Sequence, residues 1–82
     1  MVLPSKHIKI SESYIGIGGF VMSLLTEPLS IDVLWRKLEY DLQINQYPTF
    51  VRFEDFMLTL DLLFMLSFIE LDKQGRIINA AN

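Results

Sequence analysis

The chain has 82 residues, of which 51% are hydrophobic, and its ten acidic and seven basic side chains give a formal charge of −3. This length allows one domain at most, and the acidic balance argues against a dedicated nucleic-acid binder, which usually carries a basic patch. The sequence has no cysteine for a disulfide, and a chain this short buries only a modest fraction of its surface. We therefore expect a single domain over residues 1–82 that is stabilised by association with a partner.

No stretch of the sequence indicates secretion or a membrane span. The first ten residues, MVLPSKHIKI, lack the apolar region of a signal peptide. The apolar run over 56–69 is too short to cross a bilayer, and Asp61 lies inside it. The absence of cysteine is typical of a reducing compartment. We expect a soluble, cytoplasmic protein with no membrane contact.

The first predicted elements are a short strand and a helix. Apolar residues alternate with polar ones over 7–10, which is typical of a half-buried strand. Ser11 is a suitable N-cap for a helix over 11–27, and Pro28 ends that helix because the residue before a proline avoids helical geometry.

This helix contains three glycines, Gly16, Gly18 and Gly19. Each costs up to about 1 kcal/mol relative to alanine inside a helix. A nucleotide-binding loop would need further glycines or a following Lys-Ser/Thr pair, in a strand-turn-helix context, and none of these is present. We interpret the glycines as positions where another helix packs closely.

A second helix is predicted over 30–42, with Ser30 as its N-cap. A linker over 43–50 follows, whose role the sequence leaves open. The apolar positions of the helix recur at three- and four-residue spacing, which predicts one buried stripe. This stripe consists of Ile31, Leu34, Trp35, Leu38 and Leu42.

The longest apolar run of the chain predicts a third helix over 52–68. A helix on the surface of a small domain normally has one polar side. Here Asp61 shares its stripe with Leu58, Met65 and Phe68, so apolar residues lie on almost all sides. This helix is expected to have neighbours on more than one side, which indicates a protein partner rather than chemistry.

A β-hairpin is predicted over 69–78, because two β-prone runs flank a turn that contains Gly75. The predicted order is therefore strand, helix, helix, helix, hairpin. This is a mainly α, α+β fold of the winged helix-turn-helix type. The helix over 52–68 takes the place of the recognition helix, and the hairpin takes the place of the wing.

The sequences of several segments resemble those of a known family of short prokaryotic proteins. These segments are LPSKHIKISES, YIGIGGF, SIDVLWRKL and FEDFMLTLDLLFMLSFIELD, and the resemblance extends from Leu3 to about Gly75. Its most specific parts are Leu34-Trp35 and the run from Phe53 to Leu71. The family is the middle components of ABC-three-component systems, and the sequence is most similar to the group numbered middle component 6. Ser67 stands where the resemblance leads us to expect a small residue, often glycine.

The resemblance implies a role between two larger proteins. Such systems are thought to pair an SMC-like ABC ATPase with an effector, often a nuclease, and to act against phages or plasmids. The small middle component would be a non-enzymatic adaptor that bridges them or docks on them. The family brings no catalytic or cofactor-binding residues with it.

The adaptor hypothesis places the partner interface on the third helix. The residues we predict to form it are Leu58, Asp61, Leu62, Met65 and Phe68. The same apolar stripe would also suit a homodimer around a two-fold axis, and the sequence does not separate these alternatives.

A DNA-binding regulator of winged-helix type is the second hypothesis. A recognition helix should carry Arg, Lys, Asn or Gln toward the bases, whereas this one offers Glu54, Asp55 and Asp61. Lys73 and Arg76 on the hairpin could contact the phosphate backbone, so we expect DNA contact that is weak or confined to a larger complex.

Catalysis is the third hypothesis and the least supported. The chain has one histidine and no cysteine, and neighbouring carboxylates such as Glu54 and Asp55 do not face each other on a helix. We predict that the protein is not an enzyme and has no catalytic, cofactor-binding or metal-binding residues.

Overall fold

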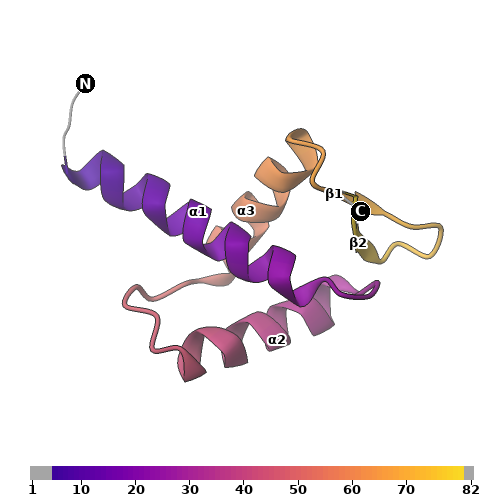
Figure 1. The fold of residues 1–82 in the computed structure, drawn as a ribbon, viewed down its shortest axis with the longest axis horizontal. Helices are drawn as coiled ribbons and strands as arrows, with labels where there is room; N and C mark the ends of the chain where they lie inside the picture. The colour runs from indigo at the N-terminus through magenta and orange to yellow at the C-terminus, as the bar shows by residue number, and fades with distance from the viewer. Residues whose placement is uncertain (1–4, 81–82) are drawn as a thin grey trace.

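The computed structural model describes the backbone of residues 5–80 and the side chains of residues 14–80. Within this range the chain forms three helices followed by one antiparallel hairpin (Figure 1), which confirms the predicted α+β fold class. The elements are α1 (Ser5–Leu24), α2 (Ile31–Ile44), α3 (Phe53–Met65), β1 (Ile69–Leu71) and β2 (Ile77–Asn79).

The strand predicted over 7–10 is wrong, because these residues belong to α1. The helix also begins six residues before the predicted cap at Ser11, which lies inside it, and ends at Leu24 rather than at residue 27. Four alternating residues are too short a pattern to separate strand from helix. A strand also needs a neighbour, and the hairpin lies near the opposite, C-terminal end of α1 (Figure 1).

The sheet gains a third, one-residue strand between α1 and α2. The Leu29 N–H donates to the Ile77 carbonyl at 3.0 Å, and the Ile77 N–H donates to the Leu29 carbonyl at 2.7 Å. β2 thus pairs on one side with β1, where Glu70 lies opposite Ile78, and on the other side with this bridge. The bridge fixes the hairpin to the connection between α1 and α2.

The second and third helices lie close to their predicted positions. Ser30 caps α2 as predicted, since its Oγ accepts the Val33 N–H at 3.3 Å. The helix continues to Ile44, two residues beyond the predicted end. α3 begins one residue later and ends three residues earlier than predicted, and the Asp55 carboxylate accepts the Arg52 N–H at 2.9 Å at its start.

α1 packs against both α2 and α3 (Figure 1), α2 also contacts α3 through Trp35, and the core forms where these three helices meet the hairpin. Phe56 of α3 is fully buried and its ring lies 5.1 Å from the ring of Trp35 on α2. The most buried apolar side chains come from all the elements and from the connection after α1. They are Ile17, Val21, Leu25, Leu29, Leu34, Leu38, Leu42, Phe56, Leu60, Leu63, Ile69 and Ile77.

The backbone conformation of Ser67 reverses the chain just after α3, and it predicts how a glycine at this position changes the free energy of unfolding. Its φ is +65°, a left-handed conformation that costs a residue other than glycine about 1–2 kcal/mol. The reversed chain is held by the Phe68 N–H, which donates to the Leu63 carbonyl at 2.9 Å. We expect Ser67→Gly to raise the free energy of unfolding by about 1 kcal/mol in urea titration. Ser23→Gly, inside α1, should lower it; equal effects of both changes would contradict this explanation.

Candidate protein-binding groove

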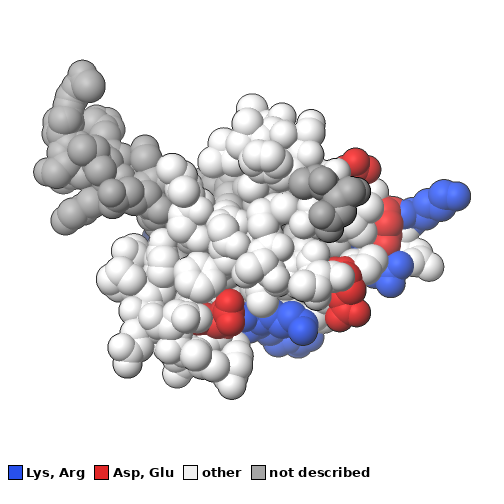
Figure 2. Space-filling view, viewed as in Figure 1, with Lys and Arg blue, Asp and Glu red and all other residues white. Residues whose placement is uncertain are grey.

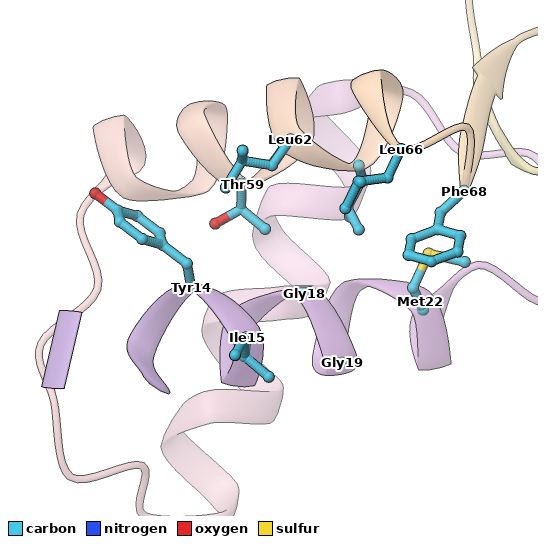
Figure 3. A pocket seen from close by; sticks show the side chains of 10 residues that line it. Tyr14, Ile15, Gly18, Gly19, Met22, Thr59, Leu62, Leu66 and Phe68 are labelled. Atoms are coloured by element: carbon cyan, nitrogen blue, oxygen red, sulfur yellow. The ribbon is translucent and has the colours of Figure 1, made fainter. Parts of the chain in front are cut away.

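An apolar groove of about 330 Å³ lies between α1 and α3. Figure 3 shows Leu62 and Leu66 on the α3 side, with Tyr14 toward one end of the groove and Phe68 beside Met22 at the other. The described residues that line it are Tyr14, Ile15, Gly18, Gly19, Met22, Thr59, Leu62, Leu63, Leu66 and Phe68.

Glycines shape the α1 side of the groove. Gly18 is buried, and a Cβ there would lie 3.8 Å from the side chains of both Thr59 and Leu63. This is ordinary van der Waals contact, so α3 lies next to Gly18, but an alanine would fit there and the packing does not require glycine. Gly19 is exposed, and a Cβ there would meet nothing within 4 Å. Because Gly19 has no side chain, the α1 wall of the groove is low here and the α1 backbone is open to close approach by another molecule.

Gly16 has a different role. A Cβ at this position would lie 2.5 Å from the hydroxyl of Tyr47, which belongs to the connection between α2 and α3. The Tyr47 ring in turn packs edge-on against Phe20 at 5.6 Å between centroids. Gly16 therefore makes room for a linker side chain rather than for another helix.

The two glycines give opposite predictions for alanine substitution. Gly19→Ala is expected to raise the free energy of unfolding by about 1 kcal/mol, because alanine favours the helix and meets no neighbour. Gly16→Ala gains the same preference but must displace Tyr47, so its net effect should be clearly smaller or negative. Urea titration of both variants measures the difference, and equal stabilisation would contradict the Tyr47 contact.

The floor and the α3 wall of the groove present apolar groups. Thr59 is buried, and its Oγ1 donates to the Asp55 carbonyl at 2.8 Å. Its hydroxyl is thereby satisfied within the helix. Leu62, Leu66 and Phe68 are all exposed. Large apolar side chains along the groove are therefore exposed to solvent in the chain alone.

The structure places the five predicted interface residues in two groups. Leu62 and Phe68 line the groove. Leu58, Asp61 and Met65 are exposed and do not line it; their spacing places them together on the outer face of α3. All five are accessible to a partner, and their contact with one stays a prediction.

Sequence reasoning missed Ile15 and Leu66 as surface candidates. Both line the groove, and Ile15 is 74% exposed. Leu66 follows Leu62 by four residues, so the helical spacing was a signal for it. The sequence carried no comparable signal for Ile15, since its exposure depends on where α3 crosses α1.

No charged side chain lines the groove among the residues that the structure describes. On the face that Figure 2 shows, the acidic and basic atoms lie mainly along the edge formed by α2 and the hairpin, and the described part of α1 and α3 is almost uncharged. From Tyr14 to Leu24, α1 has no charged residue. The exposed apolar side chains thus form a face without the charges that normally separate such residues on a soluble surface.

The sequence was compared with protein families, curated proteins and solved structures. It matches the family model described as ABC-three component (ABC-3C) system Middle Component 6 over residues 3–79. The chain belongs to this family. No curated protein and no solved structure matched it. The family match confirms the resemblance found in the sequence and makes the chain a middle component of an ABC-three component system.

The Middle Component 6 hairpin carries the two predicted phosphate-contacting residues. Arg76 Nε lies 2.8 Å from the Asp72 carboxylate, so its charge is partly neutralised. Lys73 is exposed and forms no ion pair with any described residue. Glu54 and Asp61 are exposed on α3, where a recognition helix would face DNA. A weak phosphate contact from Lys73 stays a prediction.

Asp72 organises the hairpin turn of this middle component and makes it sensitive to acid. Desolvation raises the pKa of its carboxyl group, but hydrogen bonds from the Arg76 backbone and side chain, a hydrogen bond from the Gln74 N–H, and the Arg76 charge together lower it below its usual range. A lowered pKa in the folded state means that the stabilisation is present above the ordinary aspartate pKa of about 3.9 and is lost as pH falls through the lower folded value.

We therefore expect the Gln74 and Arg76 amide signals to shift together, in an NMR titration, at a pH below the ordinary aspartate range. Asp72→Asn should abolish this transition and speed amide exchange in the turn at neutral pH. If the Gln74 and Arg76 amide signals of the wild-type chain instead shifted in the ordinary aspartate pH range, the assigned hydrogen bonds would be contradicted.

Two further kinds of site were sought among the described residues of the Middle Component 6 chain. No group of three or more His, Cys, Asp or Glu side chains in that range could hold a metal ion. No helix there is both long and apolar enough to cross a membrane.

Proposed function

We propose that this middle component is a non-enzymatic adaptor that docks on the other components of its system through the apolar surface of α1 and α3. By the family resemblance, these components are an SMC-like ABC ATPase and an effector, in a system that acts against phages or plasmids. The observation that supports docking most strongly is the uncharged groove with large exposed side chains along it.

The energetics favour a covered groove. Soluble monomers rarely expose contiguous apolar patches, and those that do usually use them to bind other molecules. Burying one Leu or Phe side chain contributes about 1.5–3 kcal/mol. Leu62, Leu66 and Phe68 are all exposed in the chain alone, so a partner that covers them gains a substantial part of a stable interface.

A second exposed apolar group supports a bridging role. Tyr40 and Ile44 on α2 and Phe50 in the following connection are exposed, and Phe50 is 84% accessible. None of these three residues lines the groove between α1 and α3, so this group is separate from it. Two separate apolar surfaces would let one small chain contact two partners at once.

The lining of the groove supports a non-enzymatic role. Its side-chain polar groups are the hydroxyls of Tyr14 and Thr59, and the Thr59 hydroxyl already donates to a backbone carbonyl. Nucleophilic and acid–base catalysis usually need a base beside the reacting group. The part of the lining that the structure describes provides no His, Asp, Glu, Lys or Cys for this purpose.

Co-expression with the proteins of the neighbouring genes tests the proposal. A tagged copy of this chain is expected to co-purify with at least one of them through size-exclusion chromatography. The same experiment with the isolated chain gives its own mass and examines the homodimer alternative. A stable homodimer that binds none of the neighbouring proteins would contradict the adaptor proposal.

A further inference from the structure

We propose that the groove between α1 and α3 binds an amphipathic helix of a different protein, with apolar side chains in the groove and Lys or Arg along the edge of that helix. The inference rests on the proposed docking function and adds the conformation and charge of the segment that is bound. Backbone hydrogen bonding, groove shape and surface charge each support it.

Backbone hydrogen bonding favours a helix over an extended segment. The walls of the groove are α1 and α3, whose backbone groups bond within their own helices. An extended peptide laid between them would find no backbone partners for its own N–H and C=O groups, which are costly to leave unpaired. A helix satisfies these groups internally and needs only apolar contacts.

The shape of the groove agrees with this mode of binding. The low wall at Gly19 lets a partner backbone approach α1, and Tyr14 and Phe68 lie toward its two ends (Figure 3). A groove between two helices fits side chains spaced three and four residues apart on one helix.

Two exposed acidic residues among those that the structure describes lie close to exposed apolar residues. Asp61 lies beside Leu58 and Met65 on the outer face of α3, and Glu70 follows Phe68 on β1. Both are exposed, and neither forms an ion pair with a described residue. A second copy of this chain would bring the same acids to the interface. A partner helix with basic edges would instead be attracted, and electrostatic complementarity of this kind sets specificity and association rate.

Single-cysteine crosslinking identifies the segment that is bound. The natural chain has no cysteine, so Asp61→Cys and Glu70→Cys each provide one attachment point for a short photocrosslinker in the co-expressed complex. We expect both positions to link to one segment of another component, with apolar residues at three- and four-residue spacing and Lys or Arg beside them. Links to a second copy of this chain, or to an acidic or alternating segment, would overturn the inference.

Charge reversal separates this inference from the adaptor proposal. The double variant Asp61→Lys/Glu70→Lys should bind its partner roughly tenfold more weakly at low ionic strength, with a smaller difference at high ionic strength. Glu27→Lys, an exposed change in the connection between α1 and α2, is the control and should leave the affinity unchanged. If the complex forms and the double variant leaves its affinity unchanged, the proposal of a basic partner helix is wrong and the adaptor proposal stands. If no variant and not even the wild-type chain forms a complex, both proposals are wrong.

Discussion

Replacing Leu66 with glutamine is expected to weaken binding of the middle component to its partner by tenfold or more. Leu66 lines the groove and is 61% exposed in the free chain, so its side chain is available to a partner and contributes little to the core. Burying a leucine contributes about 1.5–3 kcal/mol, and each 1.4 kcal/mol changes a dissociation constant tenfold. Glutamine keeps a similar length without adding a charge. Titration of the purified components measures the change.

Leu71 provides the matched control for this variant. It is the same residue type, it is 55% exposed, and it does not line the groove. Leu71→Gln should leave the affinity close to that of the wild-type chain, and both variants should unfold at nearly the wild-type urea concentration. Equal loss of binding in the two variants would show that general surface hydrophobicity, rather than the groove, holds the partner.

Truncating Phe56 to alanine is expected to cost about 3–5 kcal/mol of folding free energy. Its side chain is fully buried, and its ring lies 5.1 Å from Trp35 and 5.8 Å from Phe53. A domain of this size has a total stability of about 4–12 kcal/mol on the usual per-residue scale. The variant should therefore lose roughly a quarter or more of the folding free energy, and circular dichroism should show unfolding at a clearly lower urea concentration.

Phe53→Ala is the control for the aromatic contact. Phe53 touches the same Trp35, with 5.4 Å between ring centroids, but it is 45% exposed. Its truncation removes an aromatic contact without opening a closed cavity, so it should cost clearly less than Phe56→Ala. A loss below about 1 kcal/mol for Phe56→Ala would contradict its place at the centre of the core.

Much of the fold could be predicted because α2, α3 and the hairpin each have strong local signals. Ser30 caps α2 as expected, and Gly75 has a φ of +78° in the predicted turn. The strand over 7–10 failed because a four-residue alternation says nothing about a neighbouring strand. The bridge at Leu29 was missed because a one-residue strand has no periodicity, and only its partner Ile77 reveals it.

The candidate groove could be predicted only in part. The apolar surplus of α3 was visible in the sequence, and it led to Leu62 and Phe68. The groove itself depends on how α1 crosses α3, which no local pattern specifies. Ile15 is exposed and Ile17 is buried for that reason, although both belong to one apolar helix. The sequence shows the glycines, and the structure distinguishes their roles.

Hydrogen–deuterium exchange on the complex and on the free chain tests the docking claim most directly. If the groove between α1 and α3 binds the partner, complex formation should slow exchange in residues 14–22 and 58–68, and the hairpin turn around Gly75 should exchange as it does in the free chain. Slower exchange confined to α2 and the hairpin, with 14–22 and 58–68 unchanged, would contradict the account.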